Sequence, residues 1–332
     1  MGINSEKSTL DIRRPAEACN LGQSVINYGM AKYADRLPAN VDGALFVDGN
    51  CIDCNTCRWI APKLFSAADG YSRVYRQPKS APDWTDAARA LIACPTGAIG
   101  SRDKSRPELG PEPYPELIHG DVYYCGYHSP ASFGAASYLI RTDDGNILVD
   151  SPRFARRLVD RIEALGGIET MFLTHRDDVA DHDKFAAHFG CDRILHADDI
   201  SAGTRGVERQ LTGTEPISIG QNLTVIPVPG HTPGSACLLY KDQYLFTGDH
   251  LSWDADFPRL RASRQVCWYD WDLQCASMQL LADFRFEWIL PGHGRRCHLA
   301  AADMGPALAE LIGRMRGGAA GAYQVHNLAA AS

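Results

Sequence analysis

Four cysteines in the first third of the chain are spaced for metal chemistry. Cys51, Cys54 and Cys57 follow one another at intervals of three residues, and Cys94 stands well downstream, directly before Pro95. Thiolates this close on a tight loop can all face one iron–sulfur cluster, whose remaining corner is taken by a cysteine from elsewhere in the chain. The spacing therefore predicts an iron–sulfur cluster held by these four cysteines.

The surrounding residues narrow the kind of cluster. A two-cluster run would carry a further cysteine at position 61, which is an alanine here, so one cluster is predicted. A hydrophobic strand over 44–48, a helix over 84–93 and the closing run CPTGAI accompany the cysteines. Over residues 42–101 this pattern resembles the single-cluster [4Fe–4S] ferredoxins. Two alternatives stay open, a structural zinc site with four cysteines and a cluster with a purely structural role.

A second set of metal-binding side chains lies in the C-terminal two-thirds of the chain. Loops at strand ends are held by a rigid sheet and can converge on one point. Neutral imidazoles and carboxylates are the ligands that borderline divalent metals prefer. Side chains of these types, each placed just after a short apolar run, are Asp150, His175, Asp181, His182, His231, Asp249 and His293. Their order predicts a metal site at one edge of a sheet, with Asp150 orienting the ligating histidines.

This series resembles the metallo-β-lactamase superfamily over about residues 119–300. The resemblance implies an αβ/βα sandwich, in which two sheets face each other with helices outside and the ligands come from loops at one edge. It also implies that Asp249 bridges two metal ions. The full set of ligands that it implies is His175, Asp181, His182, His231, Asp249 and His293.

The second motif departs from the family pattern. That motif reads His-x-His-x-Asp-His, whereas position 177 here is an aspartate. Either Asp177 or Asp178 replaces the missing histidine, or the position is vacant. A carboxylate moves the preference of the site from zinc toward iron or manganese, and the flavodiiron proteins and persulfide dioxygenases of the superfamily tolerate such a departure. The predicted cofactors are one [4Fe–4S] cluster and one or two metal ions, iron or zinc, with manganese as an alternative.

The elements that must position these residues indicate an α+β protein with two domains. The predicted segments are an N-terminal extension (1–38), a [4Fe–4S] ferredoxin-like domain (39–103), a proline-rich linker (104–118), a metallo-β-lactamase-fold sandwich (119–316) and a flexible tail (317–332). In the second domain, apolar runs predict strands over 137–141, 146–150, 170–174, 192–196, 222–228, 236–240, 244–247 and 288–290. Helical periodicity predicts helices over 155–165, 181–188, 273–284 and 301–315.

Composition excludes several classes of protein. The formal net charge of −7 and the lack of a long basic run argue against a nucleic-acid partner. No stretch approaches ~18 consecutive apolar residues, so no membrane span is predicted. The first twenty residues hold no apolar signal segment, which predicts a cytoplasmic protein. The expected partners are a small-molecule substrate and a redox partner protein. An arginine- and aromatic-rich segment over 253–271 fits either an anionic or flat substrate or a domain or dimer contact, and so allows a homo-oligomer.

Three functions are compatible with these sites. An iron-dependent oxidoreductase acting on dioxygen, nitric oxide or a sulfur species is favoured by the cluster and by the carboxylate-rich second motif. The first alternative is a hydrolase, in which a metal-bound hydroxide attacks a thioester, lactone or phosphoester and the cluster is structural or regulatory. The second is a non-enzymatic electron-transfer or sensor module. For an enzyme, the predicted catalytic residues are Asp249 and His250.

Overall fold

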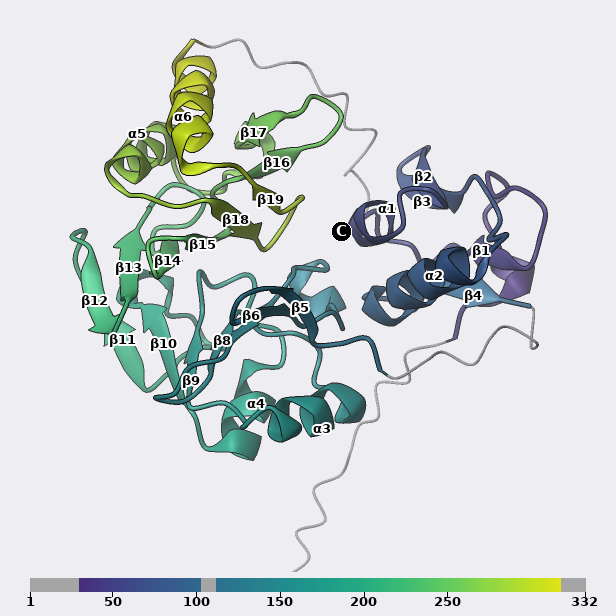
Figure 1. The fold of residues 1–332 in the computed structure, drawn as a ribbon, viewed down its shortest axis with the longest axis horizontal. Helices are drawn as coiled ribbons and strands as arrows, with labels where there is room; N and C mark the ends of the chain where they lie inside the picture. Colours follow the sequence, from purple (N-terminus) through teal and green to yellow (C-terminus); the bar gives the residue numbers. More distant parts are fainter. Residues whose placement is uncertain (1–29, 103–111, 318–332) are drawn as a thin grey trace, which may run out of the picture.

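The computed structural model describes residues 30–102 and 112–317, which form a small unit and a large unit lying side by side (Figure 1). Within these two ranges, no helix combines the length and the apolar character that a membrane crossing needs. The predicted tail and residues 1–29 of the predicted extension lie outside the described residues, apart from residue 317.

The small unit carries the cysteines. Its helix α2 (Ala81–Ala93) begins three residues before the predicted helix, because the Ser80 side chain accepts a hydrogen bond from the Asp83 N–H and a proline stands in the first turn. The helix ends at Ala93, and Cys94 follows it in an extended conformation. The remaining elements are η1 (Tyr33–Asp35), β1 (Leu45–Val47), α1 (Thr56–Ile60), β2 (Phe65–Ala68), β3 (Tyr71–Val74) and β4 (Ile99–Ser101), with β1 paired to β4 and β2 to β3.

The large unit contains two sheets that face each other. The first has the order β11 (Arg209–Leu211), β10 (Asp192–His196), β9 (Thr170–Phe172), β8 (Ile147–Val149), β7 (Tyr138–Ile140), β6 (Val122–Tyr124) and β5 (Glu116–His119). The second has the order β12 (Ile217–Gly220), β13 (Leu223–Pro227), β14 (Ala236–Tyr240), β15 (Tyr244–Gly248), β18 (Trp288–Pro291) and β19 (Cys297–His298). A separate hairpin is formed by β16 (Ser252–Asp254) and β17 (Arg259–Arg261).

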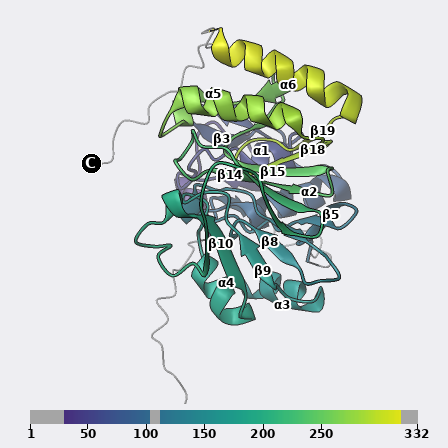
Figure 2. The ribbon, with the colours of Figure 1, turned by 90° about the vertical axis from the view of Figure 1, so that its left-hand side faces the viewer.

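Helices cover the outer faces of both sheets (Figures 1 and 2). Helices α3 (Arg156–Ala164) and α4 (His182–Phe189) lie beside the first sheet, and α5 (Trp271–Leu280) and α6 (Ala301–Arg316) beside the second. The short helical turns are η2 (Pro130–Ser132), η3 (Ala197–Asp199), η4 (Arg264–Val266) and η5 (Leu281–Asp283).

The burial of strand β14 shows that both faces of the second sheet are packed against other elements. Side chains alternate along a strand, and all five residues of β14 are buried. Leu238 and Tyr240 belong to the core between the sheets, whereas Cys237 and Leu239 belong to the core under α5 and α6. The layers are therefore helix, sheet, sheet, helix, which confirms the predicted αβ/βα sandwich.

The sequence predicted most of the apolar strands but missed the apolar strand β6 and several polar strands. Each of the eight predicted strands is present, with bounds that shift by at most two residues. The strands that were not predicted in the large unit include β5, β12 and β19, whose residues are half-exposed or exposed and carry little apolar signal. The predicted linker also ends too late. It was placed up to residue 118, but the chain pairs with β6 from Glu116 onward, and Tyr114 is already fully buried.

The two units share one continuous packing surface. Trp59, Ile60 and Ile92 of the small unit pack against the main core of the large unit. The Arg153 guanidinium donates a hydrogen bond to the Ile92 carbonyl at 3.3 Å. The contact brings the cysteine loop, and the helix that follows it, directly against the large unit.

Candidate cluster and metal sites

The cysteine loop is turned back on itself by two residues with left-handed backbone. Asp53 (φ 58°) and Asn55 (φ 68°) flank Cys54, and Asn and Asp tolerate this conformation better than most residues. The Arg58 Nε donates to the Asn55 side chain at 2.7 Å, which holds the turn. As a result the four predicted ligands, Cys51, Cys54, Cys57 and Cys94, all line one small cavity.

The chemistry of this cavity fits an iron–sulfur cluster. Burial raises the pKa of Cys54 to about 11 and also raises the pKa values of Cys51 and Cys57, so thiolates here need a positive counter-charge. Hydrogen-bonding groups already lie at the sulfurs: the Ser72 N–H donates to Cys51 Sγ at 3.4 Å, and the Thr56 hydroxyl oxygen lies 3.4 Å from Cys54 Sγ. From Cys51 onward, every cysteine that the structure describes is a free thiol.

Four of the predicted metal ligands converge at one rim of the sandwich. His175, His231, Asp249 and His293 follow strands β9, β13, β15 and β18. Asp249 lies at the centre: its Oδ2 is 3.9 Å from His175 Nε2 and 3.6 Å from His231 Nε2. Its Oδ1 is 2.8 Å from His293 Nδ1. The predicted convergence of strand-end loops is therefore observed.

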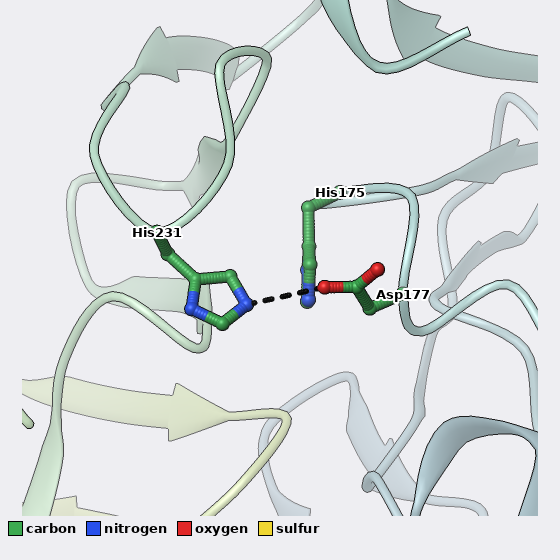
Figure 3. A group of neighbouring side chains, drawn as sticks. All are labelled: His175, Asp177 and His231. Carbon is green, nitrogen blue, oxygen red and sulfur yellow. Dashed lines mark ion pairs between the residues drawn. The ribbon is translucent and has the colours of Figure 1, made fainter. Parts of the chain in front are cut away.

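Both carboxylates of the altered second motif join this group. Asp177 Oδ2 lies 3.5 Å from His231 Nε2, and Figure 3 shows the Asp177 carboxylate turned toward His175 and His231. Asp178 Oδ2 lies 4.0 Å from His175 Nε2 and 3.9 Å from His293 Nδ1. Asp177 thus faces the two-histidine half of the site, where the family histidine is missing, and Asp178 faces the half that contains His293.

Asp181 and His182, predicted as ligands from the resemblance, do not reach the group. Asp181 accepts a hydrogen bond from the Phe154 N–H at 2.8 Å and pairs with Lys184 at 2.7 Å. The His182 ring lies 3.1 Å from an Arg193 nitrogen and 3.3 Å from a backbone carbonyl. The physical reason is that α4 begins at His182, so both side chains leave with the helix while Asp178 stays in the loop.

Unpartnered polar atoms show that the group is built to receive a cation. Buried polar atoms are almost always hydrogen-bonded. Among the described residues of this group, those left without such a partner include His175 Nε2, both carboxylate oxygens of Asp178 and His231 Nε2. This donor set of imidazole nitrogens and carboxylate oxygens fits a divalent transition metal.

Asp150 orients the first histidine, as the sequence predicted. The Thr174 hydroxyl donates to the buried Asp150 carboxylate at 3.0 Å and therefore accepts from His175 Nδ1, also at 3.0 Å. This arrangement leaves the Nε2 lone pair of His175 facing the site. Gly248 makes room for it, since a Cβ at that residue would lie 2.5 Å from the Thr174 hydroxyl oxygen.

Asp199 was not predicted from the sequence, yet it joins two ligand loops. Its Oδ2 accepts from the Arg176 N–H at 3.0 Å and from the Thr232 hydroxyl at 2.6 Å, and its Oδ1 accepts from the Gly234 N–H at 2.8 Å. Arg176 follows His175 and Thr232 follows His231, so this buried carboxylate fixes the distance between the two loops. Only its place after an apolar strand could have signalled this role.

His250, predicted as catalytic, lies buried next to Asp249 in the chain. Neither ring nitrogen has a hydrogen-bond partner among the described residues. Burial lowers the pKa of His250 to about 3, with a further contribution from His231, so its ring is neutral. Its catalytic role stays a prediction.

The carboxylates of the group keep His293 protonated, and a bound metal ion would displace this proton. Burial opposes charge on Asp249, but His293, His175 and His231 together bring its pKa below the usual range. Burial likewise opposes charge on His293, but Asp249 and Asp178 raise its pKa to about 10. Without an ion, His293 is therefore a cation at neutral pH and carries the positive charge of the site.

We expect metal binding to release this proton. A metal binds the neutral imidazole, and His293, with its pKa near 10, is protonated at neutral pH. The apparent affinity for Zn²⁺ should therefore rise about tenfold per pH unit between about pH 6 and 8 if one proton is displaced. Competition with a chromophoric chelator across this range measures it, and an affinity that is the same at every pH would contradict the charge assignment.

Comparisons with known proteins agree with this architecture. Residues 47–101 match the family described as "4Fe-4S single cluster domain of Ferredoxin I", which confirms the predicted [4Fe–4S] domain. No curated protein matches the chain.

Several solved structures are similar to part of the chain. The metallo-β-lactamase DIM-1 exposed to ceftazidime is 18% identical, with a TM-score of 0.45, covering 59% of this chain and 95% of that one. FIM-1 from Pseudomonas aeruginosa in its mono-zinc form is 20% identical, with a TM-score of 0.43, covering 54% and 84%. BJP-1 from Bradyrhizobium japonicum is 17% identical, with a TM-score of 0.41, covering 59% and 89%. Residues 47–101 therefore match a single-cluster [4Fe–4S] ferredoxin domain, and the large unit beside them is the αβ/βα sandwich expected from the resemblance to the metallo-β-lactamase superfamily.

Proposed function

We propose that this protein is an iron-dependent oxidoreductase in which the [4Fe–4S] cluster supplies electrons to the His/Asp metal site. The observation that carries this proposal is a single loop, residues 125–137 between β6 and β7, that touches both sites. Gly134 packs on a cluster ligand, since a Cβ there would lie 2.8 Å from Cys54 Cβ and 3.1 Å from its Sγ. The ring of the preceding residue, Phe133, has its centroid 6.2 Å from that of His293.

The short connection favours redox chemistry over hydrolysis. Gly134 packs on Cys54, and Phe133 lies beside His293. These two loop residues are consecutive, and consecutive Cα atoms are about 3.8 Å apart. The path from the cluster ligand to the metal ligand is therefore short. Electron transfer between two centres falls steeply with distance and needs such proximity. Hydrolysis uses no electrons and gains nothing from it.

The donor set of the metal site gives separate support. Three carboxylates, Asp177, Asp178 and Asp249, lie among the three histidines of the group. Oxygen-rich sites favour iron and manganese more than sites built from imidazole alone. His175, Asp177 and His231 would hold one ion, and Asp178 and Asp249, together with His175 or His293, would hold a second. Iron bound there would supply one-electron chemistry toward dioxygen, nitric oxide or a sulfur species.

Two exposed aromatic side chains flank this group. Phe133, which is 48% exposed, lies beside His293, and Trp268, which is 62% exposed, has its ring centroid 6.3 Å from that of His231. Apolar surface next to the ligands suits a small, weakly polar substrate better than a large charged one. Electrons would reach the cluster from a separate redox partner protein.

The test uses anaerobically purified protein. It measures the metal content, and it compares the rate of cluster reoxidation between the wild-type protein and a metal-site variant. We expect iron beyond the four atoms of one cluster. After reduction with dithionite, the cluster should be reoxidised faster by dioxygen, nitric oxide or a persulfide in the wild-type protein than in Asp249→Asn, as followed by its visible absorbance. Zinc in the second site, thioester or phosphoester turnover, and equal reoxidation in both proteins would instead establish the hydrolase.

A further inference from the structure

A buried histidine of the large unit stands between the two units. His128 is 1% exposed, and its Nε2 lies 2.5 Å from the Tyr124 hydroxyl. Its Nδ1 lies 2.5 Å from the Gly134 carbonyl oxygen and 3.1 Å from the hydroxyl oxygen of Thr56, which belongs to the small unit. None of these contacts involves the metal site, so they serve another purpose.

The partners of His128 fix where its hydrogen lies. A carbonyl oxygen can only accept, so Nδ1 must carry the hydrogen that faces Gly134. Nε2 is then an acceptor, and the Tyr124 hydroxyl donates to it. Burial lowers the pKa of His128 to about 3, which agrees with a neutral ring that carries a single N–H.

The same N–H decides the direction of the Thr56 hydroxyl. Because Nδ1–H also faces Thr56 Oγ1, that oxygen acts as an acceptor toward His128 and its own hydrogen must point elsewhere. The other polar atom at hydrogen-bond distance is Cys54 Sγ, at 3.4 Å. A cysteine that binds a cluster is a thiolate and can only accept. The hydroxyl therefore donates to Cys54 Sγ.

We propose that His128 is a positioning residue for the cluster: it aims the Thr56 hydroxyl at Cys54 Sγ and thereby raises the reduction potential of the cluster. Hydrogen bonds to the sulfurs of a cluster are among the factors that set its potential, because they stabilise the more negative, reduced state. The large unit thus adjusts the redox properties of the small unit. This role is independent of which metal the second site binds.

The test is an EPR-monitored redox titration of the full chain with its cluster. Thr56→Val removes the hydroxyl, and His128→Leu removes the N–H that directs the hydroxyl toward Cys54 Sγ. We expect each change to lower the midpoint potential, by the equivalent of about tenfold in the reduction equilibrium, or roughly 59 mV for one electron. The double variant should be no lower than Thr56→Val alone, because both changes remove one shared interaction. Thr56→Ser, which keeps the hydroxyl, should stay near the wild-type potential.

Two further variants keep the outcome decisive. Thr96→Val is the matched control, since the Thr96 hydroxyl lies 3.9 Å from Cys94 Sγ and His128 does not contact it, so the potential should hardly change. His128→Phe keeps a flat ring but carries no N–H, so it should lower the potential in the same way, and it serves if His128→Leu does not retain its cluster. The proposal fails if Thr56→Val leaves the potential unchanged. It also fails if Thr56→Val lowers the potential while cluster-containing His128→Leu or His128→Phe keeps the wild-type value.

Discussion

Asp249→Asn is expected to strip the metal from the large unit while leaving the visible absorbance of the cluster unchanged. Asp249 is the carboxylate that faces all three histidines of the group, with nitrogen–oxygen distances from 2.8 to 3.9 Å. Mutating a group that merely supports a ligand costs about 10–100-fold in metal affinity, so loss of the central carboxylate should cost more than about 100-fold. Metal analysis after dialysis against a weak chelator measures the change.

The matched control is Asp181→Asn, the same substitution at a carboxylate that the sequence also predicted as a ligand. Asp181 is tied to Phe154 and Lys184 instead of the group, so this variant should keep its full metal content. The two variants separate the ligand set seen in the structure from the set implied by the resemblance. Equal metal loss in both, or retained metal in Asp249→Asn, would overturn the ligand assignment.

Cys54→Ser is expected to abolish the cluster and its visible absorbance. A serine hydroxyl has a far higher pKa than a thiol, so it is a much weaker ligand for iron at neutral pH than a cysteine thiolate. Cys54 is also the cysteine that Gly134 of the large unit covers, so the variant should lose the rapid consumption of the oxidant with a supplied electron donor as well. Iron and sulfide analysis, together with the optical spectrum, checks the first expectation, and the measured rate of oxidant consumption checks the second.

Cys267→Ser provides the comparison for this change. Cys267 is a half-buried thiol outside the cluster, and its Sγ donates to the Gly230 carbonyl at 3.1 Å, a bond that a hydroxyl can also make. Its cluster content should match that of the wild-type protein. Catalysis that survives in cluster-free Cys54→Ser with every donor or ester supplied would show that the cluster is structural.

Much of this architecture follows from local sequence pattern alone. The spacing of Cys51, Cys54 and Cys57 predicts a cluster because three thiolates on one short loop have few other uses. The buried strands were predicted because their apolar runs are uninterrupted, as in β14, whose bounds are those expected. His231, Asp249 and His293 were predicted as a group because each directly follows such a strand, and strand ends are where a sheet brings distant residues together.

The tertiary structure decided the ligands that depend on where a helix begins. Within the run from His175 to His182, the sequence offered three acidic residues and two histidines without showing which remain in the loop. The answer depends on α4, which starts at His182 because Phe185 is buried in the core and Asp181 bonds to the Phe154 N–H. These are contacts with residues distant in the chain, so no local pattern reports them.

The contact of one loop with both the cluster site and the His/Asp site could not be predicted from local sequence pattern either. His128, Phe133 and Gly134 look like ordinary loop residues in the sequence. Their importance comes from the docking of the small unit on the large one, which places Gly134 against Cys54 and Phe133 beside His293. The sequence by itself predicted two kinds of metal-binding chemistry in this protein. Only the packing of the two units determined that these centres share one loop, because that packing depends on the shapes of surfaces built from the whole chain.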